Sequence, residues 1–361
     1  MGDVTPVKKA GDLVPAGTRK PVRVLVVDDS IIARAVYNRL IAAESDLEFA
    51  GQASTAEDAL KLLETIRVDV ILLDLEMPGM GGLKALPKII AASHGAQILV
   101  VSSLTEVGAE HTITALAQGA ADTLLKPSGG QFDKEYRTGL VDRIRALGPH
   151  RYGHQVAKKP SAELRSTSKK SARMLAIGAS TGGILALRQF FENLPEKTGM
   201  PILLTQHLPA SFLPAFAEQI ERFSGRRARL AEAGMELRAD EVLIAPGNAH
   251  LEVECIGGRY FVRLNRDPSG NGCMPSVDVM LSSLAQATAG ECVAVVLSGM
   301  GRDGAKGAQM IASSGGTILV QDEATCAVWG MPGSIASAGL ASAILPPDKL
   351  AARAILTRKG R

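Results

Sequence analysis

A serine set between glycines near the middle of the chain is the first candidate for chemistry. The hexapeptide Gly178-Ala179-Ser180-Thr181-Gly182-Gly183 follows an apolar run and precedes a stretch typical of a helix, which predicts a strand–turn–helix corner. Such a corner lifts one side chain to the edge of a parallel sheet and points the free N–H groups of the helix at it. Ser180 can therefore be a nucleophile whose oxyanion those amides stabilise, or the corner can cradle a phosphate.

A histidine and an aspartate follow at the ends of two later predicted strands. His207 ends the strand predicted at 201–206, where a dinucleotide site would carry an acidic residue, and an imidazole there can act as a general base. Asp303 lies in the glycine-rich segment 298–304, after the strand predicted at 292–297. A carboxylate at that edge can accept a hydrogen bond from the histidine and fix its tautomer. The three residues together favour a nucleophile over a phosphate loop.

Other residues compete for two of these roles. Asp303 taken alone is most simply a helix N-cap, and Asp278 or Asp322 are alternative carboxylates. His250 is the rival histidine, and its place at the start of a hairpin favours a structural role. The order Ser-His-Asp differs from the Ser-Asp-His order of α/β-hydrolases, which excludes an ordinary lipase or esterase.

An acidic group is predicted at one edge of an earlier sheet. Asp28 and Asp29 end the first predicted strand, and Asp74 ends the third. One such aspartate often caps a helix, but three converging carboxylates repel one another unless a cation lies among them, and oxygen ligands of this kind suit Mg²⁺. An aspartate beside Mg²⁺ can attack a phosphoryl donor. Lys126 and Ser102, at the ends of the fifth and fourth strands, can contact the new phosphoryl group.

The elements that must position these residues form two α/β domains. In the first, near-continuous apolar strands alternate with helices, which predicts a doubly wound, flavodoxin-like parallel sheet. Its strands are predicted at 22–27, 47–53, 68–73, 97–102 and 122–126. The second is a larger α/β domain of the serine-hydrolase kind, with an inserted hairpin predicted at 251–256 and 260–265. Its strands are predicted at 174–178, 201–206, 241–245, 292–297 and 317–320.

The predicted organisation is a flexible leader (1–21), a first domain (22–147), a linker (148–172) and a second domain (173–361). The linker holds 6 Lys/Arg against 1 Asp/Glu, whereas the second domain holds 18 against 17. A nearly neutral second domain argues against nucleic-acid binding. The apolar runs are too short to insert into a membrane, and four cysteines without a Cys-x-x-Cys pair fit a cytoplasmic protein.

The first domain resembles a response-regulator receiver. The matching segments are Val26-Val27-Asp28-Asp29-Ser30, Asp74-Leu75-Glu76-Met77-Pro78-Gly79, Val101-Ser102-Ser103 and Lys126-Pro127. The resemblance implies that Asp74 accepts a phosphoryl group from a CheA-type histidine kinase. It implies Mg²⁺ on Asp29, Asp74 and the backbone carbonyl of Glu76, with Asp28 in the pocket, and Ser102 and Lys126 sensing the phosphate. Thr123 stands where many receivers carry an aromatic switch residue.

The second domain resembles the catalytic domain of CheB, the chemotaxis protein-glutamate methylesterase. Further matching segments are Pro275-Ser276-Val277-Asp278, Gln321-Asp322-Glu323-Ala324-Thr325 and Trp329-Gly330-Met331-Pro332. The resemblance implies that Ser180 attacks glutamyl methyl esters of chemoreceptors, with His207 as base and Asp303 as its orienting carboxylate. It implies an oxyanion donor at the Met300 N–H, with Thr181 in support, and no cofactor for ester hydrolysis. Cys273-Met274 replaces the His-Arg common in similar sequences.

These observations predict a phosphorylation-regulated methylesterase that also deamidates receptor glutamines. In the resting state the receiver is expected to cover the catalytic cleft. One rival is a response regulator whose second domain only binds a partner, with Ser180 in an inert turn. Another is a transcriptional regulator, which the neutral second domain of some 190 residues disfavours.

Overall fold

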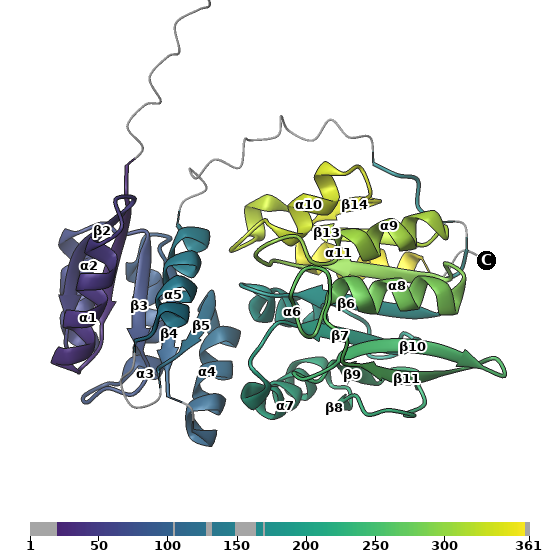
Figure 1. Cartoon of the computed structure of the whole chain (residues 1–361), viewed down its shortest axis with the longest axis horizontal. Coiled ribbons are helices and arrows are strands. Elements are labelled where there is room, and N and C mark those ends of the chain that lie inside the picture. The colour runs from purple at the N-terminus through teal and green to yellow at the C-terminus, as the bar shows by residue number, and fades with distance from the viewer. Residues whose placement is uncertain (1–19, 104, 128–131, 149–163, 169, 358–361) are drawn as a thin grey trace, which may run out of the picture.

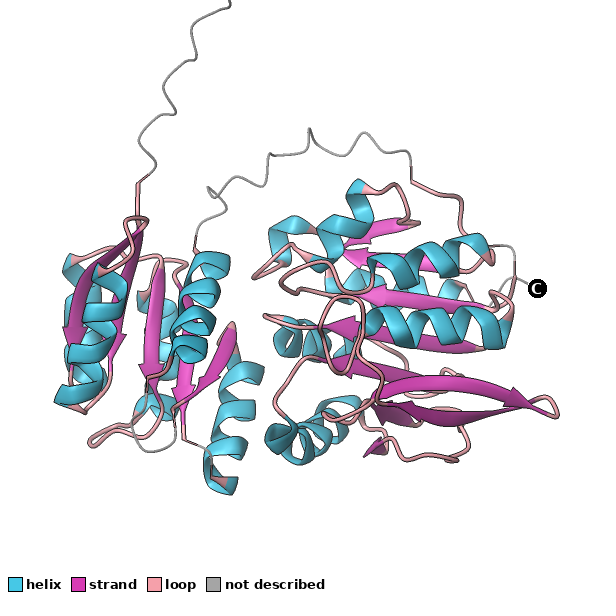
Figure 2. Cartoon of the chain, in the orientation of Figure 1, coloured by secondary structure: helices cyan, strands magenta, loops and turns pink. Residues whose placement is uncertain are grey.

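Two parallel α/β sheets lie side by side in the computed structural model of the chain (Figure 1). The structure describes residues 20–103, 105–127, 132–148, 164–168 and 170–357. Nearly all of the predicted leader and most of the predicted linker lie outside these residues. Figure 2 shows helices on both faces of each sheet, as expected for doubly wound folds.

The first sheet has the strand order β2-β1-β3-β4-β5, all parallel. Because the central strands are apolar and buried and helices cover both faces, the sheet forms the middle layer of the domain. Its strands are β1 (Val22–Val27), β2 (Leu47–Ala53), β3 (Val70–Asp74), β4 (Gln97–Ser102) and β5 (Asp122–Leu125). Its helices are α1 (Ile31–Ala42), α2 (Ala56–Thr65), α3 (Gly82–Ala92), α4 (Glu106–Gln118) and α5 (Lys134–Leu147).

The second sheet is parallel and has the order β14-β13-β12-β6-β7-β9-β8. Its strands are β6 (Met174–Ala179), β7 (Ile202–Gln206), β8 (Ala228–Leu230), β9 (Val242–Ile244), β12 (Cys292–Val296), β13 (Thr317–Gln321) and β14 (Ala343–Leu345). The α-helices of this domain are α6 (Gly183–Glu192), α7 (Leu213–Ser224), α8 (Val277–Thr288), α9 (Ala305–Ser313), α10 (Met331–Ser337) and α11 (Pro347–Leu356). Two 3₁₀ turns are η2 (Ala210–Phe212) and η3 (Glu323–Thr325).

The predicted hairpin is present as the antiparallel pair β10 (His250–Ile256) and β11 (Arg259–Asn265). The predicted fold class is thus confirmed, with two additions. The short strands β8 and β14 were not predicted, because three residues are too few to show a periodicity. Helix α5 begins at Lys134, since the Asp133 carboxylate accepts a hydrogen bond from the Tyr136 N–H and caps the helix there.

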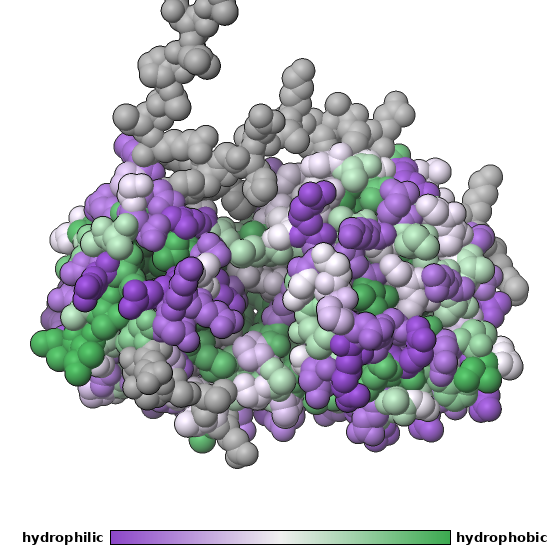
Figure 3. All heavy atoms as spheres, viewed as in Figure 1, coloured by the Kyte–Doolittle hydropathy of each residue, from purple (hydrophilic) through white to green (hydrophobic). Residues whose placement is uncertain are grey.

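The two domains share an interface built around α4. This helix packs against α6, α7 and η2 of the second domain. Apolar side chains of both domains join one hydrophobic cluster across it. On the face shown in Figure 3, hydrophilic and apolar residues are mixed over both domains, and apolar residues gather at the outer edge of the first domain. In the described part of the chain, no helix has the length and apolar character needed to cross a membrane.

Candidate active site

The serine corner has the predicted strand–turn–helix form. Ser180 directly follows β6, and Gly182 caps α6 with a φ of +76°, a conformation that glycine adopts without strain. The backbone of Ser180 is held from two neighbouring strands: its N–H donates to the Ser298 carbonyl at 3.0 Å, and its carbonyl accepts from Gln206 Nε2 at 2.9 Å. The half-buried Ser180 side chain is thus fixed at the carboxyl edge of the sheet.

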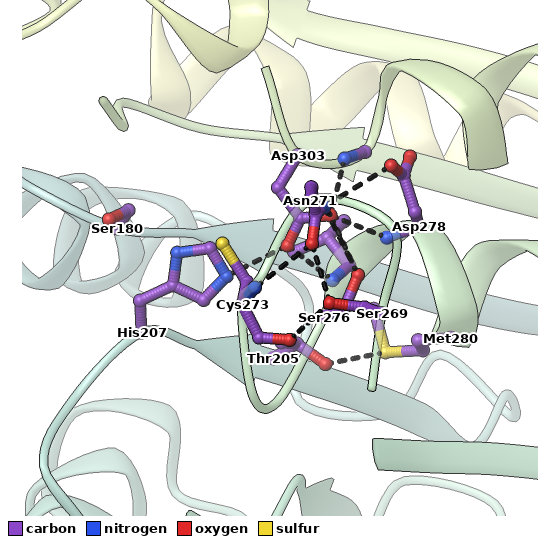
Figure 4. A network of polar contacts seen from close by, with 12 residues as sticks. Ser180, Thr205, His207, Ser269, Asn271, Cys273, Ser276, Asp278, Met280 and Asp303 are labelled. Atoms are coloured by element: carbon purple, nitrogen blue, oxygen red, sulfur yellow. Dashed lines mark hydrogen bonds and ion pairs between the residues drawn. The ribbon is translucent and has the colours of Figure 1, made fainter. Parts of the chain in front are cut away.

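His207 and Asp303 meet at the same edge. His207 follows β7, and its Nε2 lies 2.9 Å from Asp303 Oδ2. Strand β6 pairs with β7 on one side and with β12 on the other, so the three candidate residues come from neighbouring strand ends. In Figure 4 the imidazole of His207 lies between Ser180 and the carboxylate of Asp303. Because Asp303 engages Nε2, the ring nitrogen left for a proton transfer is Nδ1.

A dense set of donors holds Asp303 in its ionised form. Besides His207, five groups donate to the buried carboxylate: the Ser276 hydroxyl, the Asn271 amide and the N–H groups of Val277, Asp278 and Gly304. Burial by itself raises the pKa of Asp303, but its bonds to His207 and to the backbone amides outweigh this and lower it to about 2. Asp303 is therefore a rigid anion behind the imidazole.

The glycine-rich loop after β12 approaches Ser180 closely. A Cβ placed on Gly299 would lie 2.9 Å from Ser180 Cβ, so only glycine allows this approach. Within the described residues, the N–H groups of Thr181 and Met300 donate no hydrogen bond. Two unpaired backbone donors beside a serine are the arrangement that an oxyanion hole requires.

The rival residues have other partners. Asp278 accepts from the Gly307 N–H at 2.9 Å, and Asp322 accepts from the Thr325 N–H and caps η3. His250 is fully buried, with Nε2 bonded to the Asp267 carbonyl and Nδ1 accepting from the Ser276 N–H. Both of its ring nitrogens are occupied, which leaves His207 as the histidine beside Asp303.

The acidic residues of the first domain also converge. Carboxylate oxygens of Asp28, Asp29 and Asp74 lie within 4.8 Å of one another, a group able to hold a metal ion. Lys126 Nζ lies 2.7 Å from Asp74 Oδ2 and 3.2 Å from Asp28 Oδ2. Burial raises the pKa of Asp74 to about 6, although Lys126 opposes the shift. A cation among these oxygens would relieve the repulsion, and the all-oxygen ligands fit Mg²⁺.

The remaining predicted residues surround this pocket. The N–H of Glu76 donates to Asp74 Oδ1 at 3.0 Å, so the main chain at Glu76 lies against Asp74. Ser102 is buried at the end of β4, and its hydroxyl finds no hydrogen-bond partner within the described residues. A buried hydroxyl without a partner is costly unless a ligand supplies one.

Comparisons with known proteins match each of the two domains to a family. Residues 175–354 match the CheB methylesterase family, and residues 24–132 match the response regulator receiver domain. A protein-glutamate methylesterase/protein-glutamine glutaminase of Paramagnetospirillum magneticum is 38% identical over 93% of this chain and 96% of its own. One from Caulobacter vibrioides is 40% identical over 91% of this chain and 96% of its own. The chain belongs to the CheB methylesterase family.

A solved structure supports the same assignment for the second domain. The Thermotoga maritima CheB methylesterase catalytic domain is 36% identical, with a TM-score of 0.50, and the match covers 52% of this chain and 98% of that one. This CheB protein thus joins a response-regulator receiver to a methylesterase domain. The order of the two domains is the one that the sequence predicts.

The receiver of this CheB protein touches the serine corner directly. Thr181 Oγ1 donates to Asp122 Oδ2 at 2.7 Å, and the Gly182 N–H donates to the Ala121 carbonyl at 2.6 Å. Farther along α6, Arg188 donates to the Ala117 carbonyl at the end of α4. The start of β5 therefore lies against the residues that follow Ser180.

The roles of several residues at the CheB site were not predicted from the sequence. Asn271 and Ser276 bind Asp303, Gln206 fixes the Ser180 backbone, and Asp122 reaches Thr181 from the receiver. The segment Pro275-Ser276-Val277-Asp278 carried a signal through its family resemblance, but nothing in its spacing indicates which carboxylate it binds. For Asp122 the sequence indicates only its position at the start of a strand and gives no sign of a contact with the second domain.

Proposed function

We propose that this CheB protein hydrolyses glutamate methyl esters on chemoreceptors and deamidates glutamines there, with Ser180 as nucleophile. The observation that carries the proposal is the 2.9 Å contact between His207 and Asp303 at the strand end next to Ser180. The curated relatives named above are protein-glutamate methylesterases and protein-glutamine glutaminases, which supports the same reaction class.

In the proposed reaction His207 accepts the Ser180 hydroxyl proton on Nδ1 while Ser180 Oγ attacks the ester carbonyl carbon. The imidazolium is stabilised by ionised Asp303, which the surrounding amides keep charged. His207 then returns the proton to the departing methoxide, so methanol leaves and an acyl-enzyme remains. Water, deprotonated by His207, hydrolyses the acyl-enzyme to a glutamate carboxylate. With a glutamine substrate the leaving group is ammonia and the other steps are the same.

The N–H groups of Met300 and Thr181 are the proposed donors to the oxyanion. Their lack of partners within the described residues supports this role, because charge that develops on the carbonyl oxygen then meets donors already in place. The close approach at Gly299 brings the Met300 backbone to the serine corner.

The experiment that tests this activity is methanol release from membranes carrying methylated chemoreceptors. We expect release by the full chain and a loss of roughly three or more orders of magnitude in Ser180→Ala. Ser282→Ala, on α8, is a matched control, because within the described residues the Ser282 hydroxyl bonds to the Asp278 carbonyl and to no other group. Equal release by the wild type and Ser180→Ala would contradict the serine mechanism and favour a second domain that only binds a partner.

The receiver is the proposed control element. We propose that a CheA-type histidine kinase phosphorylates Asp74, and that Asp29, Asp74 and the Glu76 carbonyl hold Mg²⁺, with Asp28 completing the acidic pocket. Mg²⁺ supplies charge neutralisation for the incoming phosphoryl group. Ser102 and Lys126 then contact the phosphoryl oxygens. The Ser102 hydroxyl, which has no hydrogen-bond partner in the described part of the chain, supports this role.

Phosphorylation is proposed to release the receiver from the catalytic domain. The receiver contacts the serine corner through Ala121 and Asp122, at the start of the edge strand β5. Lys126, which directly follows β5, forms an ion pair with Asp74 and so links this strand to the phosphorylation site. Once Lys126 binds the phosphoryl group, the start of β5 shifts and the substrate reaches Ser180. We place the protein in the cytoplasm, with the segments 1–21, 22–147, 148–172 and 173–361 as leader, receiver, linker and catalytic domain.

A further inference from the structure

Cys273 lies at the catalytic centre, although the proposed reaction does not use it. Its sulfur, a ring nitrogen of His207 and a carboxylate oxygen of Asp303 all lie within 4.8 Å of one another. Figure 4 shows the sulfur beside the imidazole of His207. Within the described residues the Cys273 thiol has no hydrogen-bond partner.

The loop that carries Cys273 is firmly built onto Asp303. Asn271 Nδ2 donates to Asp303 Oδ1 at 2.7 Å, and Asn271 Oδ1 accepts from the Cys273 N–H at 3.0 Å. The Ser269 hydroxyl lies 2.7 Å from both Asn271 Oδ1 and the Cys273 carbonyl. The Asn271 side chain therefore ties the backbone of Cys273 to the carboxylate of Asp303.

We propose that His207, Cys273 and Asp303 form an inhibitory binding site for a thiophilic divalent cation such as Zn²⁺. One imidazole nitrogen, one sulfur and one carboxylate oxygen are a usual zinc ligand set, and three protein ligands leave a fourth position for water. A thiolate ligand selects Zn²⁺ over Mg²⁺, which prefers oxygen. The site rests on the geometry alone, whereas its inhibitory effect rests on the proposed role of His207.

The ion would stand where the His207–Asp303 hydrogen bond now runs. A tetrahedral ion with bonds of roughly 2.0–2.3 Å holds its ligand atoms about 3.3–3.7 Å apart, so the 2.9 Å pair must open slightly while the sulfur closes in. The thiol proton leaves to solvent, and the imidazole binds in its neutral form. A His207 that binds a metal ion can no longer take the Ser180 proton, so hydrolysis stops until the ion leaves.

The surrounding negative charge favours a bound cation. Burial and the carboxylates of Asp303 and Asp278 raise the pKa of the Cys273 thiol to about 11. The same two carboxylates attract a divalent ion.

Cobalt absorption is the direct test, because a Co²⁺–thiolate bond gives an intense charge-transfer band and needs no enzyme activity. The full chain is titrated with Co²⁺ in excess Mg²⁺, which fills the all-oxygen receiver pocket. We expect one Co²⁺ per chain with the band, its displacement by Zn²⁺, and its loss in both Cys273→Ser and Cys273→Ala. Cys255→Ser is the matched control, since Cys255 is an exposed thiol on the β10–β11 hairpin.

Zinc inhibition of methanol release is the second measurement. We expect Zn²⁺ to inhibit the wild type and Cys255→Ser, and a chelator to restore the rate of both. In Cys273→Ser the inhibition constant for Zn²⁺ should rise at least tenfold. Inhibition of each variant is measured relative to its own rate without zinc. A cobalt band that survives in Cys273→Ser, or that disappears in Cys255→Ser, would overturn the site. A normal cobalt band in a protein that releases no methanol would instead support the site and contradict the proposed function.

Discussion

Thr181, the residue after the proposed nucleophile, donates a 2.7 Å hydrogen bond to Asp122 of the receiver. Thr181 is buried, and Asp122 also forms a 3.5 Å ion pair with Arg143 on α5. Next to this contact the Gly182 N–H donates to the Ala121 carbonyl. The receiver thus binds the backbone and side chain of the turn that carries the proposed nucleophile.

Removal of the Asp122 carboxylate is expected to raise the unphosphorylated rate. Asp122→Ala deletes the acceptor of Thr181, and a buried hydroxyl left without a partner weakens docking by about 1–3 kcal/mol, or roughly 5- to 150-fold. Methanol release without a phosphodonor should therefore rise by about tenfold and respond less to phosphorylation. Asp142→Ala, at an exposed position on α5, is the matched control and should leave both rates unchanged. An unchanged rate in Asp122→Ala would show that this contact does not restrain the enzyme.

The docking of the two domains is expected to weaken as the pH rises. Burial raises the pKa of Asp122 above its ordinary value of 3.8, although Arg143, Thr181 and the Thr123 N–H oppose the shift. Because the catalytic domain packs against Asp122 and adds to its burial, the docked state binds more protons than the separated state, so docking is strongest at low pH and weakens as the pH rises through the raised pKa. The measurement is the hydrogen-exchange protection factor of the Gly182 amide, which bonds across the interface.

Asp122→Asn tests the sign of this dependence. The amide keeps an acceptor for Thr181 but does not titrate, so the protection factor of Gly182 should become independent of pH in that window. A wild-type protection factor that increases with pH would contradict the assignment to Asp122.

The convergence of the proposed catalytic residues, and that of the acidic residues, could be predicted for one physical reason. In parallel sheets the carboxyl ends of neighbouring strands share an edge, so residues such as Ser180, His207 and Asp74 could be placed from strand ends alone. Asn271 could not be placed this way, because it lies in a loop whose path depends on the packing of α8. Asp122 could not either, since an interdomain contact requires the surfaces of two folded domains.

Phosphorylation is expected to stimulate the enzyme only through Asp74. Asp74→Asn removes the carboxylate that we propose attacks the phosphodonor, so a small-molecule phosphodonor with Mg²⁺ should speed methanol release by the wild type and not by the variant. Removing Mg²⁺ with a chelator should abolish the stimulation in the wild type as well, because the acidic pocket then has no cation to neutralise it. Stimulation that persists in Asp74→Asn would place the phosphoryl group elsewhere.

Ser276 is expected to stabilise the protein and to position Asp303. Its buried hydroxyl donates to Asp303 Oδ1 at 2.8 Å, and Ser276→Ala removes a hydrogen bond to a charged group. The free energy of unfolding should fall by about 1.5–3 kcal/mol, measured by chemical denaturation, and kcat should fall while KM changes little.

Ser282→Ala is the control for Ser276→Ala, because it also removes a serine hydroxyl bond but leaves Asp303 untouched. The Ser282 hydroxyl donates a 2.7 Å hydrogen bond to the uncharged backbone carbonyl of Asp278. Loss of this bond should lower the free energy of unfolding by only about 0.5–1.5 kcal/mol and leave kcat unchanged. If both variants lost the same stability and kept the same kcat, the hydroxyl of Ser276 would have no special part in holding Asp303. A larger loss in Ser276→Ala, together with a lower kcat, would show that the orientation of His207 depends on how many donors hold the carboxylate behind it.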